Sequence, residues 1–263
     1  MSEEGPQTIR GFPATSWTLV RRARESDDVA AGRALDALCR AYWRPLYAHA
    51  RGAGLASADA QDAVQDFFAA ALRRELFQRA DEQEGKLRSF LLTAFKRVLI
   101  DRAAQAGAAR RTPEGGWAEG DFELAEAEWA RMAGGGGATP DAVFERQWAR
   151  ELIARATRLT QARYEAEGKS EVFAELRTEA LEEGESERKN DGNAQRKRTE
   201  RQSDRSAKGA EGMTAGARRV AVHRLRKRFG EALRAAVAET LPEGADAEAE
   251  LRALGATLRR GGE

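Results

Sequence analysis

The chain has few of the residues that build metal centres and disulfide frameworks. Its 263 residues include one cysteine, Cys39, and two histidines, His49 and His223. A single cysteine excludes an internal disulfide and a four-thiolate metal site. Two histidines without further thiols also argue against zinc coordination. We therefore expect neither a metal ion nor a cofactor.

Long apolar runs are missing as well. No segment approaches the roughly 20 apolar residues that cross a bilayer, and the first residues, MSEEGPQ, do not form a signal peptide. The sequence therefore predicts no membrane association and a cytoplasmic location. Charged residues make up 33% of the chain against a net charge of only +1. Positive and negative charges are thus both abundant, and they are concentrated in different segments of the chain.

Two amphipathic helices are predicted between residues 55 and 102. The apolar residues of the first recur at helical spacing on one face: Ala60, Ala63, Val64, Phe67, Phe68, Ala71 and Leu72. Its polar face carries Asp59, Asp62 and Asp66. The second has its own apolar stripe: Leu87, Phe90, Leu91, Ala94, Phe95, Val98 and Leu99. Its outward face is predicted to be basic: Lys86, Arg88, Lys96, Arg97 and Arg102. An acidic helix beside a basic one suggests an adaptor between a protein and a polyanion, although charged outer faces are common on soluble helices.

Composition divides the chain into two predicted helical domains. The first covers 12–105, and a flexible Gly-rich linker covers 106–139. Thr139 and Pro140 then open a second domain, 140–240, with the residue types of a helix N-terminus. Within it, residues 185–208 have no aliphatic or aromatic residue larger than alanine, so we expect a disordered polar insert at 185–211. Residues 241–263 form a C-terminal tail with a small acidic helix.

A strongly basic helix is predicted to follow Thr214, its N-cap. Its buried positions are expected to be Val222, Leu225, Phe229, Leu233 and Val237. The opposite face carries Arg219, His223, Arg226 and Lys227, flanked by Arg218, Arg224 and Arg228. A capped, basic, amphipathic helix after a Gly-containing turn is typical of the recognition helix of a helix-turn-helix, which enters the major groove. An arginine-rich surface helix is the alternative.

Residues 60–68 (AQDAVQDFF) and 90–102 (FLLTAFKRVLIDR) resemble conserved region 2 of the sigma-70 family of bacterial transcription initiation factors. The resemblance is to the extracytoplasmic-function (ECF) group, in particular an ECF-like subset with an N-terminal FPxTxW motif, present here at 12–17. The segment 212–229 resembles the region 4 recognition helix. The resemblance implies an all-α protein with a region 2 bundle and a region 4 helix-turn-helix, which acts as a non-enzymatic sigma factor.

The resemblance also implies site residues. Binding to the beta and beta-prime subunits of the RNA polymerase core falls to Asp59, Asp62, Gln65, Asp66 and Phe68. Contact with the −10 element and the melted strand falls to Arg88, Phe90, Lys96, Arg97, Asp101 and Arg102. Contact with the −35 element of promoter DNA falls to Thr214, Arg218, Arg219, His223 and Arg226. An anti-sigma factor is a further candidate partner.

Two departures from the family pattern shape the expectations. Arg97 stands where ECF proteins commonly have asparagine, and the polar insert replaces the apolar helix that normally precedes the recognition helix. We therefore expect Val220, Leu225 and Phe229 to pack on 140–181, and −35 recognition to be weakened while core binding survives. The alternative is a degenerate sigma-like protein that binds core polymerase or DNA without directing promoter-specific initiation. An enzyme is disfavoured, because no catalytic constellation is visible in the sequence.

Overall fold

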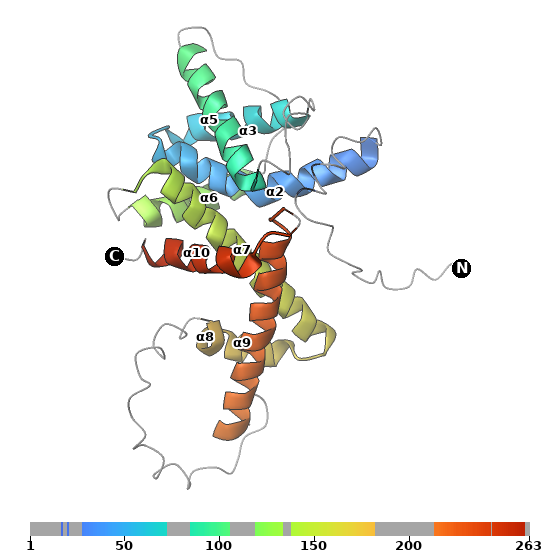
Figure 1. The fold of residues 1–263 in the computed structure, drawn as a ribbon. Helices are drawn as coiled ribbons and strands as arrows, with labels where there is room; N and C mark the ends of the chain where they lie inside the picture. The colour runs from blue at the N-terminus through green and yellow to red at the C-terminus, as the bar shows by residue number, and fades with distance from the viewer. Residues whose placement is uncertain are drawn as a thin grey trace, which may run out of the picture. The chain divides into compact units, whose positions relative to one another are not determined.

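The computed structural model describes residues 17, 20, 28–72, 85–105, 119–133, 138–181, 213–242 and 244–260. Within these ranges the chain forms eight α-helices and no strand, which confirms the all-α prediction. The helices, labelled in Figure 1, are α2 (Asp28–Gly52), α3 (Ser57–Leu72), α5 (Leu87–Gln105), α6 (Glu119–Ala133), α7 (Pro140–Ala166), α8 (Ser170–Leu181), α9 (Ala215–Ala238) and α10 (Ala247–Arg259).

The chain divides into two compact units that differ from the predicted domains. The first unit comprises Met1–Glu151 with Val237–Glu263, and the second comprises Leu152–Ala236. The first unit therefore holds α6, the beginning of α7 and α10 in addition to the predicted 12–105. One part of the prediction is wrong: residues 119–133 of the expected flexible linker form helix α6. The glycine run at 134–137 and the expected insert at 185–211 lie outside the described residues.

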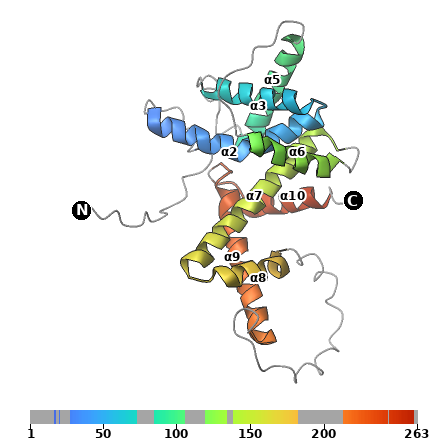
Figure 2. The same ribbon diagram turned by 180° about the vertical axis from the view of Figure 1, so that it is seen from behind.

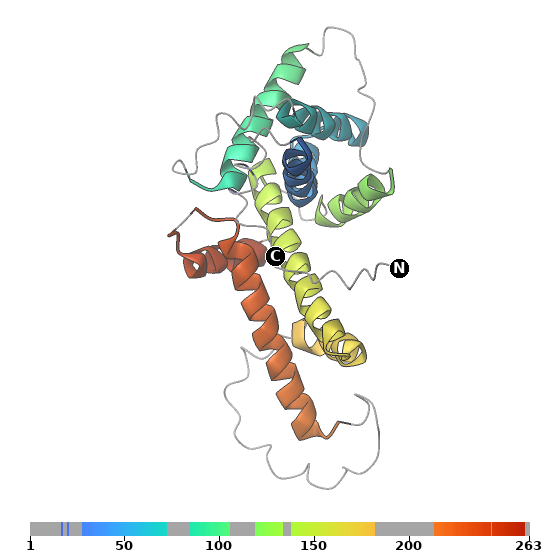
Figure 3. The same cartoon turned by 90° about the vertical axis from the view of Figure 1, so that its right-hand side faces the viewer.

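Helix α2 is the centre of the first unit. Figure 3 looks nearly along it, with α3, α5 and α6 packed around it. The helix continues through Pro45 and ends at Gly52, followed by Gly54 with a φ of 93°. A Cβ atom at Gly52 would lie 3.3 Å from the Cα atom of Pro140. The close approach between the end of α2 and the start of α7 therefore depends on a glycine.

The core of this unit confirms most of the predicted apolar stripes. On α3 the buried members are Ala60, Ala63, Val64, Phe67, Phe68 and Ala71. On α5 they are Leu87, Leu91, Ala94 and Phe95, whereas Phe90, Val98 and Leu99 are partly exposed. Phe67 packs edge-on against Phe95 with ring centroids 5.4 Å apart. The aromatic contact joins α3 to α5 and adds to the apolar area that both helices bury.

Helix α6 is attached to α2 by aromatic and polar contacts. The Phe122 ring lies 5.1 Å from Trp43 and 5.7 Å from Tyr47, measured between centroids. The Glu126 carboxylate accepts hydrogen bonds from Arg51 at 2.7 and 2.9 Å and from the Tyr47 hydroxyl at 2.5 Å. Burial, followed by the bond to Glu126, raises the pKa of Tyr47 to about 12. Residues 119–133 thus belong to the packed structure around α2.

The second unit is built from the end of α7, α8 and most of α9. Figure 2 shows α8 following α7 after a sharp turn, at which Gly168 has a φ of 67°. The amide of Lys169 closes this turn by donating to the Tyr164 carbonyl at 2.8 Å. The core of the unit consists of Tyr164, Phe173, Leu176, Ala180, Val222 and Leu225. Helix α9 thus packs its apolar side on 164–180.

The packing expected for the basic helix is correct in part. Leu225 is fully buried among residues of α7 and α8, as predicted, and Val222 joins it. Phe229 is only partly exposed and lies outside this cluster. The prediction for Val220 is wrong, since its side chain is 50% exposed. Val220 and Val222 are two positions apart on a helix, so they point to different sides and only one can face α8.

Candidate nucleic-acid interface

The predicted polymerase-binding residues lie on α3, but not all of them are on its surface. Asp59, Asp62, Gln65 and Asp66 are partly exposed, whereas Phe68 is buried at 5% exposure. Arg102 of α5 forms an ion pair with Asp66 and approaches Asp62 at 4.0 Å. The acidic face of α3 is therefore partly neutralised by a neighbouring helix.

Most basic residues of α5 have carboxylate partners within the first unit. The Lys86 Nζ atom lies 2.5 Å from Glu250, and Lys96 Nζ lies 2.6 Å from Asp141. Arg102 is held by the carboxylates of α3. Arg97 and Asp101 are exposed, and no ion pair links Arg97 to the described part of the chain. Arg97 is thus the cation of α5 most available to an external phosphate.

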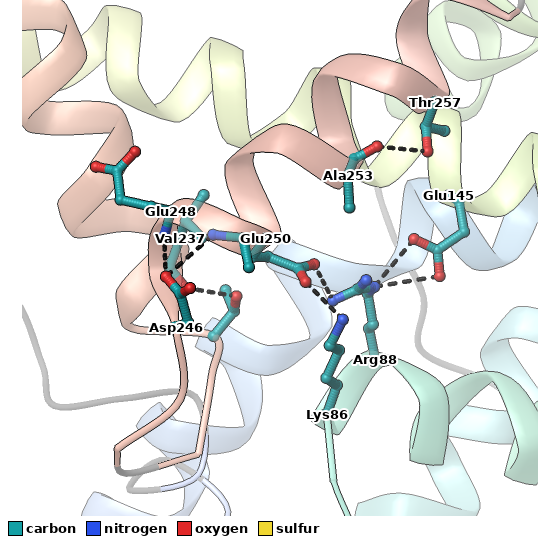
Figure 4. A network of polar contacts seen from close by, with 11 residues as sticks. Lys86, Arg88, Glu145, Val237, Asp246, Glu248, Glu250, Ala253 and Thr257 are labelled. Atoms are coloured by element: carbon teal, nitrogen blue, oxygen red, sulfur yellow. Dashed lines mark hydrogen bonds and ion pairs between the residues drawn. The ribbon is translucent and has the colours of Figure 1, made fainter.

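The predicted outward position of Arg88 is wrong, because its side chain is buried at 7% exposure. Its guanidinium donates to both Glu145 oxygens at 3.0 and 3.1 Å and stacks 4.2 Å from the centroid of Trp148. The Nη1 atom also lies 2.6 Å from a carboxylate oxygen of Glu250 (Figure 4). Residues of α7 and α10 therefore cover this position of α5.

Three of the five predicted −35 contacts have roles inside the second unit or at its edge. The Thr214 hydroxyl caps α9 by accepting from the Ala217 amide at 3.1 Å, which confirms the predicted cap. Arg218 pairs with Glu179 at 2.7 Å. Arg226 donates to the carbonyls of Ala180 and Glu179 at 3.1 and 3.2 Å. These carbonyls are at the C-terminal end of α8, where helix carbonyls lack intrahelical partners.

The remaining predicted residues, Arg219 and His223, are exposed on α9. Lys227 is exposed as well and continues the same row, because 219, 223 and 227 are four residues apart. Exposed Arg224 and Val220 lie beside this row. We call Arg219, Val220, His223, Arg224 and Lys227 the α9 stripe. Lys227 and Arg224 were not among the predicted DNA contacts, although helical periodicity in the sequence places Lys227 on this side.

The described part of the chain offers little for other chemistry. No group of three or more His, Cys, Asp and Glu residues lies close enough there to hold a metal ion. No helix within the same ranges combines the length and apolarity needed to span a bilayer. Comparison with known proteins finds no matching family model, no matching curated protein and no matching solved structure.

Proposed function

We propose that the chain is a promoter-specificity subunit of bacterial RNA polymerase, a sigma factor of the ECF-like type. The proposal rests first on the resemblance of 60–68, 90–102 and 212–229 to sigma regions 2 and 4. The structural observation that carries it is the α9 stripe, in which Arg219, Arg224 and Lys227 are exposed on a capped helix whose opposite side is anchored by Leu225. Basic side chains in a row on one helix face fit the phosphate backbone of DNA.

In this function the two helices act on different forms of DNA. The stripe residues Arg219, His223 and Lys227 contact duplex DNA upstream, with phosphate contacts fixing the position of the helix. Arg97 and partly exposed Phe90, two helical turns apart on one side of α5, contact the separated strand at the −10 element. An aromatic side chain and a cation on one helix face suit an unstacked base and a phosphate of the same strand. The partly exposed Asp59 and Gln65 of α3 contact the polymerase core, and the protein acts in the cytoplasm.

A second candidate function is favoured by the ion pairs of α5. If Lys86, Arg88, Lys96 and Arg102 stay bound to carboxylates, only Arg97 remains for the separated strand. Such a protein would bind core polymerase or DNA without directing promoter-specific initiation. The two candidates differ in one observable property, the formation of transcripts with defined start sites.

In vitro transcription with purified core polymerase and a promoter library separates the candidates. We expect defined start sites with the full chain and their loss with the double variant Lys96→Ala/Arg97→Ala. The variant Asp141→Ala is the matched control, because it breaks the Lys96 ion pair while keeping both cations. Binding to core without defined transcripts would support the second candidate. Absence of core binding would overturn the first candidate, and absence of both core and DNA binding would overturn the second as well.

A further inference from the structure

A buried carboxylate of α10 lies between two cations that belong to the start of α5. Glu250 is 4% exposed, with its Oε2 atom 2.5 Å from Lys86 Nζ and its Oε1 atom 2.6 Å from Arg88 Nη1 (Figure 4). Two cations that converge on two oxygens of one anionic group form an arrangement that a phosphate can also occupy. Glu250 thus neutralises both cations at the start of α5.

The contact between Glu250 and Arg88 is close but poorly aligned. Although Arg88 Nη1 and Glu250 Oε1 are within ion-pair distance, neither buried atom has a hydrogen-bond partner in the described structure. Buried charges are stabilising only when good geometry and hydrogen bonds offset their desolvation. The desolvation of these two atoms is therefore offset less completely than in a hydrogen-bonded ion pair.

Helix α10 buries only two of its described side chains fully, Glu250 and Leu254. Leu251 and Leu258 are partly buried. Burial of one leucine contributes roughly 2 kcal/mol, and α10 is absent from the most extensively packed helix pairs of the first unit. The Glu250 carboxylate is therefore one of the two main anchors of α10.

Local interactions within α10 stabilise both of its ends. The Asp246 side chain caps its N-terminus by accepting from the amides of Glu248 and Ala249 at 2.9 and 3.0 Å. Acidic residues fill its first turn and Arg259 its last, which matches the helix dipole. These features belong to α10 itself, so they persist when the helix leaves its position.

We propose that Lys86 and Arg88 form a phosphate-binding site for the backbone of single-stranded nucleic acid, and that Glu250 occupies this site as an internal competitor. This inference rests on the proposed function, in which α5 meets the separated strand. When α10 detaches, Arg88 keeps its bonds to Glu145 and its stacking on Trp148, so the site remains formed. The phosphate takes the place of the carboxylate, and charge neutralisation at the two cations is preserved.

The test measures binding of a short fluorescent single-stranded DNA to the full chain without polymerase. Glu250→Gln removes the competing charge at nearly constant shape, and we expect about fivefold tighter binding, the factor that corresponds to a partly exposed ion pair. The control Glu248→Gln makes the same change in net charge at an exposed position of α10, and it should leave the affinity near that of the parent. Glu250→Gln/Leu254→Ala removes both anchors and should bind at least as tightly as Glu250→Gln.

A further variant tests whether the gain in DNA affinity arises at Lys86. Adding Lys86→Gln to Glu250→Gln should cancel the gain and lower the dependence of log K on log salt by about 0.7, the value for one phosphate contact on a single strand. Hydrogen exchange gives a second readout: DNA should accelerate amide exchange in 247–259 of the parent chain.

Two outcomes would overturn the inference. The first is equal DNA affinity of Glu250→Gln and Glu248→Gln, and the second is a gain that survives Lys86→Gln. Promoter-directed transcription by a chain with either outcome would leave the proposed function intact. Conversely, tighter DNA binding by Glu250→Gln in a chain that directs no transcription would support the site and contradict the sigma-factor proposal.

Discussion

Helices α5 and α9 are both rich in lysine and arginine, but they use these residues differently. On α5 and the residue before it, Lys86, Arg88, Lys96 and Arg102 have carboxylate partners from α3, α7 and α10. On α9 the basic residues divide: Arg218, Arg226 and Arg228 bind groups of the second unit, while the α9 stripe remains exposed. The number of cations on a helix therefore does not indicate how many of them can bind nucleic acid. That number depends on the carboxylates that neighbouring elements place beside them.

The largest expected effect concerns stability and distinguishes a buried arginine of α5 from an exposed one. Arg88→Ala should lower the free energy of unfolding by roughly 3 kcal/mol, because it leaves buried Glu250 and partly exposed Glu145 with one fewer cation and removes the stacking on Trp148. Arg97 is an exposed arginine of the same helix. Arg97→Ala should therefore change the free energy of unfolding by less than about 0.5 kcal/mol. Urea unfolding measures both. Similar losses in the two variants would mean that burial of Arg88 carries no energetic consequence.

The second effect concerns the exposed side of α9. Arg219→Ala/Lys227→Ala should weaken binding of a short DNA duplex by roughly tenfold and reduce the salt dependence of log K by about 1.8, the loss of two phosphate contacts. The matched control is Arg163→Ala/Arg177→Ala, which removes two exposed arginines of the same unit. Fluorescence anisotropy at several salt concentrations gives both quantities. If the control variant weakened DNA binding equally, the α9 stripe would contribute only through the net charge of the protein.

A smaller effect compares the threonines that cap α7 and α9. Thr139 accepts from the Ala142 amide at 3.3 Å, and Thr214 accepts from the Ala217 amide at 3.1 Å. Replacement of either by alanine should cost about 1 kcal/mol, because one N-terminal amide loses its acceptor. Serine at the same positions should restore most of the stability. Thermal unfolding of the four variants tests this, and a silent Thr214→Ala would argue that the amides of α9 rely on water instead.

The smallest expected effect is a pH dependence of stability that arises from buried His49. Burial lowers the pKa of His49 from its usual value of 6.5, with Asp141 opposing and Lys96 adding to the shift. The unfolded chain therefore takes up the proton at a higher pH than the folded chain, so the stability present above pH 6.5 is lost as pH falls through the unfolded pKa towards the folded one. His49→Gln should flatten this part of the stability profile, measured by urea unfolding from about pH 7.5 to about pH 5. A slope that persists in His49→Gln would assign the titration to another group.

The sequence predicts the features that depend on neighbours within one helix. The apolar stripe of α3 and the threonine caps of α7 and α9 follow from local spacing and residue type. The buried position of Leu225 follows in the same way. Such features have their causes within a few residues, which a single sequence displays.

The features that the sequence misses have distant causes. Arg88 occupies a position that local periodicity assigns to solvent, but Glu145 lies 57 residues away and covers it. Lys86 and its partner Glu250 are 164 residues apart. Helix α6 was predicted as linker because of its glycine-rich surroundings, and its attachment depends on Phe122 meeting Trp43 and Tyr47. Pairings between distant segments cannot be obtained from spacing along one helix.

The division between the two units also limits how the protein can be dissected. It falls between Glu151 and Leu152 inside α7, and between Ala236 and Val237 inside α9. A fragment that ends or begins at these points would cut a helix in its interior and leave up to four amides or carbonyls without their intrahelical partners. Limited proteolysis should accordingly spare both points, since proteases cleave exposed irregular chain in preference to helix interiors. Separate activities of the two units are therefore better assigned by exchanging side chains in the intact polypeptide than by truncation.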